Sequence, residues 1–200
     1  MTGTLRALLV VLAVAFFTSA CGGNSPVAPS PTVTISRPLV LSGQSNALFE
    51  SPWLAAVYPL SVLTVAESGR AIEGWSSGPP GIHWRELIPL LQQPLQAFAW
   101  WQGESDRDNP NYLSDLRDLM ARVRQTNGSP QLLVIEVRIL DFPQNAGVRA
   151  VQETFVRTDT NAILVSTDGF QLDAGDHLTE AGYQAVAQRI LAAARSSSVR

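Results

Sequence analysis

The residues best suited to covalent chemistry are a serine and a histidine far apart in the chain. Ser45 follows Gly43-Gln44 directly after an apolar run, where a tight strand-to-helix turn would expose its hydroxyl. His177 is one of only two histidines and follows acidic residues. A serine nucleophile needs a base within hydrogen-bond reach and a group that orients the base. This pair therefore indicates nucleophilic catalysis, with Ser45 as nucleophile and His177 as general base.

The spacing leaves open which acid would orient His177. Asp173 lies four residues before the histidine, and Asp176 lies one residue before it. Adjacent side chains usually diverge, which favours Asp173. Asp176 could instead cap a helix that begins here. Both remain candidates.

Short apolar runs predict the strands that must position these residues. The helical patterns between them recur at a spacing of three to four residues. Strands that alternate with helices indicate a single three-layer α/β/α domain with a five-stranded, mainly parallel sheet. The predicted strands are 38–41, 61–66, 96–101, 131–139 and 162–166, and the predicted helices are 82–92 (interrupted at Pro89), 109–127, 146–158 and 179–194.

Four segments rich in polar residues each follow a predicted strand. They are 43–46, 67–69, 102–106 and 168–177. A parallel sheet places such loops along one edge, and ligands bind outside the carboxyl ends of its strands. The topology therefore predicts that Ser45 and His177 meet at this edge.

The same segments resemble the conserved blocks of the SGNH hydrolases. The blocks are GQSN at 43–46, ESGRAIEGW at 67–75, WWQGESD at 100–106 and DHLT at 176–179. They are most similar to the sialate O-acetylesterase and acetylxylan-esterase-like branch of carbohydrate esterases. Their order along the chain extends the resemblance over residues 38 to 195. It implies a flavodoxin-like SGNH hydrolase fold and an acetylesterase without metal or cofactor.

The resemblance also implies roles for individual residues. Ser45 would attack the ester carbonyl of an acetylated carbohydrate or small ester, and His177 would carry the proton. The backbone N–H groups of Ser45 and Gly69 and the side chain of Gln102 would form the oxyanion hole. The supporting residues would be Gln44, Asn46, Gly103 and Glu104.

The chain departs from this pattern at two places. The family's acid usually lies two or three residues before the histidine, and Ala47 stands where Met is common. The irregular acid spacing keeps open a catalytically silent carbohydrate-binding lipoprotein, and the versatile fold keeps open a lipid or thioester hydrolase.

Residues outside these blocks have less specific interpretations. We expect Trp53 and Trp75, in predicted loops, to be better placed than other tryptophans for stacking on a sugar. We expect His83 to lie at the surface or cap a helix, and 106–108 to form a solvated loop.

The first 36 residues read as an export signal and a tether. Arg6 and the apolar run 7–17 are typical of a signal peptide, and residues 18–21 resemble a bacterial lipobox ending at Cys21. Residues 1–21 would then be the signal, 22–36 a Gly/Pro/Ser-rich tether, and 37–195 the hydrolase domain. This predicts a protein of the bacterial cell envelope, held to a membrane by lipid on Cys21. The alternative is ordinary cleavage near Ala20, which leaves a free thiol.

Composition excludes several other classes. The chain has 200 residues, of which 46% are hydrophobic and 16% charged, which is typical of a globular domain. Its net charge is -3, and it has no lysine and no cluster of arginines, so we expect no nucleic-acid partner. One cysteine allows no internal disulfide and suggests no zinc site.

Overall fold

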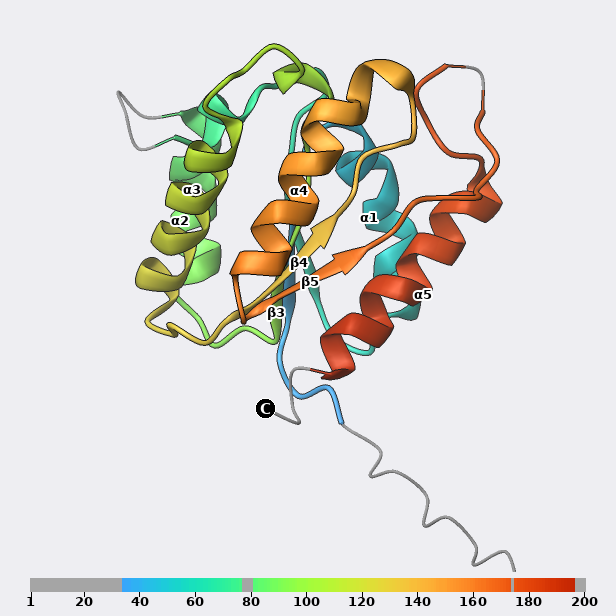
Figure 1. Ribbon diagram of the computed structural model, residues 1–200. Helices are drawn as coiled ribbons and strands as arrows, with labels where there is room; N and C mark the ends of the chain where they lie inside the picture. Colours follow the sequence, from blue (N-terminus) through green and yellow to red (C-terminus); the bar gives the residue numbers. More distant parts are fainter. Residues whose placement is uncertain (1–33, 77–80, 174, 197–200) are drawn as a thin grey trace, which may run out of the picture. The chain divides into compact units, whose positions relative to one another are not determined.

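A five-stranded parallel sheet in the order β2-β1-β3-β4-β5 forms the centre of the computed structural model (Figure 1). The structure describes residues 34–76, 81–173 and 175–196. Strands β1, β3 and β4 are buried at every residue, as expected for strands covered on both faces. The predicted sheet is confirmed. The strands are β1 Leu39–Gly43, β2 Val62–Ala66, β3 Ala97–Trp101, β4 Leu133–Val137 and β5 Ala162–Val165.

Helices cover both faces of this sheet. On one side α1 packs against α5, and on the other α3 contacts both α2 and α4 (Figure 1). The arrangement is the predicted three-layer α/β/α domain. In the described residues the helices are α1 Ser45–Val57, α2 Ile82–Leu91, α3 Tyr112–Asn127, α4 Ala146–Thr158 and α5 Glu180–Ser196, with short 3-10 turns η1 Ile72–Trp75, η2 Glu104–Asp106 and η3 Pro143–Asn145.

Two helices differ from the sequence prediction. Helix α1 was not predicted, because its apolar residues do not recur on one face and Pro52 stands inside it. Helix α5 begins only at Glu180, and Thr179 Oγ1 accepts the Gly182 N–H at 3.3 Å in the manner of a cap. The expectation that Asp176 caps this helix is therefore wrong.

The strand order reverses between β1 and β3. Two glycines at this point allow the backbone to approach neighbouring groups more closely than a residue with a side chain could. A Cβ on Gly43, which has φ +144°, would lie 1.9 Å from the Trp101 carbonyl oxygen. A Cβ on Gly103, which has φ +148°, would lie 2.6 Å from Val148 Cγ1. Ligands of doubly wound sheets bind at such a switch point, so this is where chemistry is expected.

Candidate active site

Ser45 is the first residue of α1 and lies where β1 ends at the switch point. The Gln44 N–H donates to the Trp101 carbonyl at 3.0 Å, which ties the turn to the end of β3. The Ser45 side chain is partly exposed. N–H groups in the first turn of a helix lack intrahelical acceptors, and the helix dipole is positive at this end. Ser45 thus presents its hydroxyl where negative charge is favoured.

Asn46 is completely buried and joins three parts of the site. Its Nδ2 donates to Glu104 Oε1 at 2.9 Å and to the Asp176 carbonyl at 3.3 Å. Its Oδ1 accepts the Tyr183 hydroxyl at 2.8 Å. These bonds bring together Asn46 and Glu104, two of the residues that the resemblance assigned a supporting role. They also hold the segment before His177 against the first turn of α1.

The side chains of Gln44 and Gln102 meet at the end of β3. Gln44 Oε1 accepts from Gln102 Nε2 at 3.3 Å. It also lies 3.4 Å from the backbone N–H groups of Gly103 and Ser105. One amide oxygen therefore orders the turn after β3 and connects it to the turn that carries Ser45.

Asp106 corrects the expectation of a solvated loop at 106–108. Its side chain is buried, and its Oδ2 accepts from Gln102 Nε2 and from the Ile72 N–H at 2.8 Å. A carboxylate only accepts hydrogen bonds, so it fixes which end of the Gln102 amide faces it. Sequence reasoning missed this role, and the only signal was the position of Asp106 inside the third block.

Two carboxyl groups of this region are buried, Glu104, which bonds Asn46, and Glu50, one turn along α1 from Asn46. Burial raises the pKa of Glu104, although hydrogen bonds, including one from Asn46, oppose the rise. Burial raises the pKa of Glu50 from 4.5 to about 9, and neither of its carboxyl oxygens has a hydrogen-bond partner in the described part of the chain. Glu50 is therefore neutral at pH 7.

His177 lies beside α1, one turn along from Ser45. Its ring meets Phe49 edge-on, with centroids 4.9 Å apart. Phe49 follows Ser45 by four residues and so shares its face of the helix. No hydrogen bond joins Ser45 to His177 within the described ranges, and catalytic hydrogen bonds often tighten only when substrate binds.

The loop before His177 separates the two candidate acids. The Asp173 N–H donates to the His177 carbonyl at 2.9 Å, and Leu172 pairs with Leu178, which closes the loop. Asp173 and His177 line the same hollow of about 290 Å³. Asp176 does not line it. Its exposed carboxylate lies 3.8 Å from Arg107.

Gly69 lies in an exposed turn after β2, with φ +69°. The Glu67 N–H donates to the Gly43 carbonyl at 3.1 Å, so this turn adjoins the end of β1. In the described residues the Gly69 N–H donates to no other group. The second oxyanion candidate is thus an unused donor at the same edge as Ser45.

His83 and Trp75 are structural and not exposed to a ligand, which corrects both expectations. His83 is buried, with Nδ1 3.0 Å from Glu86 Oε2 and Nε2 in contact with Glu67. Trp75 is fully buried, with its ring centroid 4.6 Å from that of His83. Trp53, by contrast, is partly exposed on α1.

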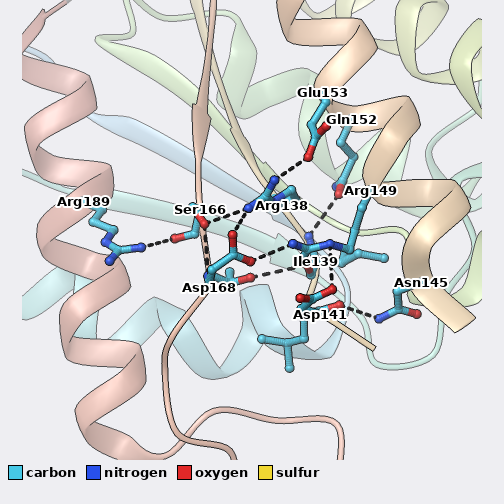
Figure 2. A network of polar contacts seen from close by, with 12 residues as sticks. Arg138, Ile139, Asp141, Asn145, Arg149, Gln152, Glu153, Ser166, Asp168 and Arg189 are labelled. Atoms are coloured by element: carbon cyan, nitrogen blue, oxygen red, sulfur yellow. Dashed lines mark hydrogen bonds and ion pairs between the residues drawn. The ribbon is translucent and has the colours of Figure 1, made fainter. Parts of the chain in front are cut away.

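An ion-pair cluster anchors the start of the segment that leads to His177 (Figure 2). Arg138, just after β4, and Arg149, on α4, both pair with Asp168, and Arg149 also donates to the Ile139 carbonyl at 2.5 Å. Burial alone would raise the pKa of Asp168, but hydrogen bonds from Arg149 and Ser166 and the two arginine charges lower it. Asp168 therefore stays ionised and ties the start of this segment to Arg138 and Arg149.

Among the described residues, no group of three or more His, Cys, Asp or Glu side chains could hold a metal ion. No helix in that part of the chain is long and apolar enough to span a membrane. The predicted signal 1–21, its Cys21 and most of the tether lie outside the described residues.

A match to a protein family shows to which family the chain belongs. A family described as carbohydrate esterase, sialic acid-specific acetylesterase, matches residues 48–196. The chain belongs to this carbohydrate esterase family. The matched region contains His177, Asp173 and Gln102, and it begins three residues after Ser45. No curated protein matches the chain.

Solved structures show the same fold as this carbohydrate esterase. A protein from Arabidopsis thaliana has a TM-score of 0.63 at 21% identity, over 76% of this chain and 68% of that one. A carbohydrate acetylesterase from Xanthomonas citri has a TM-score of 0.62 at 19% identity, over 76% and 40%. A carbohydrate esterase family 2 enzyme with a carbohydrate-binding domain, from Corynascus thermopiles, has a TM-score of 0.61 at 16% identity, over 88% and 69%.

The family and fold confirm the resemblance seen in the sequence blocks. The carbohydrate esterase has the SGNH-type α/β fold and is an ester hydrolase of the acetylesterase class. It spans less than half the length of the Xanthomonas protein.

Proposed function

We propose that this carbohydrate esterase removes acetyl groups from O-acetylated carbohydrate through an acyl-enzyme on Ser45. One observation carries the proposal. Ser45 begins α1 at the switch point, and the His177 ring packs against Phe49 on the same face of that helix. This arrangement supports a nucleophile and a base close together at the edge of the sheet where ligands bind.

The reaction has two displacements. Ser45 Oγ attacks the acetyl carbonyl while His177 takes its proton, and the intermediate collapses by returning that proton to the departing sugar oxygen. Water then gives a proton to His177 as it attacks the acetyl-serine. The second intermediate collapses when the C–Oγ bond breaks and His177 returns this proton to Ser45 Oγ, which releases acetate and restores Ser45. Asp173 would hold the His177 tautomer, because both line one hollow and their loop is closed by a backbone hydrogen bond.

The negative oxygen of each intermediate would be bound by the N–H groups of Ser45 and Gly69 and by Gln102 Nε2. Asp106 accepts one Gln102 hydrogen. The other is shared between Gln44 Oε1 and the Arg70 carbonyl, both at 3.3 Å. Neutral acceptors at that distance are weak, so an oxyanion can displace them.

The test is release of acetate from acetylated xylan and of p-nitrophenol from its acetate ester, with the full chain in detergent. Ser45→Ala and His177→Ala should each lower kcat by about 10⁶. Ser51→Ala is the matched control, because Ser51 lies on the same helix and bonds Thr64 at 2.7 Å. A Ser45→Ala enzyme that keeps its rate would disprove the proposed nucleophile. A preference for long acyl chains would favour a lipid hydrolase.

We also propose that residues 1–21 export the chain and that Cys21 carries a lipid anchor. The Arg6 and apolar-run pattern, followed by a lipobox-like segment, supports this. The wild-type protein should take up labelled fatty acid in a bacterial host and partition into detergent, and Cys21→Ser should do neither. Labelling that survives the substitution would refute the anchor.

A further inference from the structure

Helix α1 presents two aromatic side chains in line with the proposed nucleophile. Ser45, Phe49 and Trp53 are four residues apart, so they form one stripe along the helix. Phe49 is 45% exposed and Trp53 is partly exposed. The proposed reaction steps use neither ring. The four-residue spacing is a signal for this stripe only if residues 45–57 form a helix, and that helix was not predicted.

Phe49 and Trp53 line a first hollow between α1 and α5, and Trp53 also lines a second hollow beside it, whose other lining residues are mostly alanine and valine. The first, of about 290 Å³, also contains Asp173, His177, Glu180 and Tyr183. The second, of about 510 Å³, shares Trp53 and contains the amides of Gln184 and Gln188. Aromatic rings pack on the C–H faces of sugars, while carboxylates and amides bond their hydroxyls. The lining therefore fits a short chain of sugar rings.

The charged residues that line the hollows favour uncharged sugars over acidic ones. Asp173 and Glu180 line the first hollow, and among the described residues no arginine lines either hollow. The carboxylate of a sialic acid would meet like charges there, which is unfavourable, whereas sugar hydroxyls can donate to the same oxygens. The nearby Arg107 instead bonds Asn145 at 2.7 Å.

We propose that the hollows along Phe49 and Trp53 are a subsite for an uncharged sugar chain, whose acetyl ester lies at Ser45. The substrate would then be a neutral polysaccharide of the xylan type and not a sialoglycan. This inference deepens the proposed function and rests on it for the position of the ester. Binding of the sugar chain can nevertheless be measured without any turnover of the ester.

A binding experiment tests the subsite separately from catalysis. Xylotetraose, which carries no acetyl group, should bind the full-length wild type in calorimetry, and sialic acid should not. Trp53→Ala should weaken xylotetraose binding about tenfold or more. Trp84→Ala is the matched control, because Trp84 is equally partly buried, lies on α2 and packs under Arg122 at 3.9 Å.

A kinetic experiment then connects the subsite to the ester. Trp53→Ala should lower kcat/KM for acetylated xylo-oligosaccharide, relative to p-nitrophenyl acetate, by about tenfold. Trp84→Ala should leave that ratio unchanged. No xylotetraose binding, equal losses in both tryptophan variants, or tighter binding of sialic acid would overturn the subsite. An active Ser45→Ala would refute the nucleophile and leave the binding result standing.

Discussion

The two flanks of Ser45 are built differently. On the third-block flank, residues 102–106, Gln102 and Asp106 are buried and bonded to each other. On the fourth-block flank, residues 173–177, Asp173 and Asp176 are exposed. Donors that stabilise developing charge work best when fixed beforehand, whereas a base can tighten its contacts as substrate binds. The contrast is that expected if the buried flank holds the proposed oxyanion donor Gln102 and the exposed flank holds the proposed base His177.

Within the comparison of the two flanks, the largest expected effect separates the two acids of the fourth-block flank. Asp173→Asn should lower kcat by about 10⁴, because the amide would no longer select the His177 tautomer. Asp176→Asn should change kcat by less than about threefold, since its carboxylate is exposed near Arg107. Steady-state kinetics on p-nitrophenyl acetate decides this, and the reverse ranking would assign the acid to Asp176.

The connection between the flanks is Asn46, and removing it should affect both stability and rate. Asn46→Ala would leave Glu104 and Tyr183 without their buried partner, at a cost of about 3–4 kcal/mol in unfolding free energy. Asn127→Ala is the control, because Asn127 bonds the Leu91 and Gln93 carbonyls away from the site.

Urea unfolding and kcat, measured on both asparagine variants, test this connection. Both should lose stability, but only Asn46→Ala should lose activity at a temperature where it stays folded. Equal activities in the two variants would show that the flanks need no connection through Asn46.

A smaller effect on stability comes from Glu50. Its buried carboxyl group has no hydrogen-bond partner among the described residues, whereas Glu104 accepts a hydrogen bond from Asn46. Glu50 has a pKa of 4.5 when unfolded and about 9 when folded, so the folded state keeps a proton that the unfolded state loses. The contribution of Glu50 to stability should therefore be fully present below pH 4.5 and be lost as pH rises towards 9. Glu50→Gln should remove this slope and add about 2–3 kcal/mol at pH 7. Unfolding measured from pH 5 to 8 tests this, and parallel curves for both proteins would contradict it.

Much of the fold could be predicted because the buried strands are short apolar runs. Each predicted strand matches an observed one to within a few residues at either end, and 146–158 is a helix with the predicted bounds. Helix α1 could not be predicted, since Pro52 and the scattered apolar residues hide its period. It forms because packing against α5 and the sheet outweighs weak local preference.

The sequence by itself determined which residue types could do chemistry and that the sheet would bring them to one edge, because strands that alternate with helices indicate a parallel sheet, whose strands all end at the same edge. Only the tertiary structure decided that Asp106 is buried, that Trp75 is core while Trp53 lines a hollow, and that Asp173 shares the hollow with His177. Burial and side-chain contact depend on partners far along the chain. Asn46 and the Asp176 carbonyl are 130 residues apart and meet because the sheet brings the segments after β1 and β5 to the same edge.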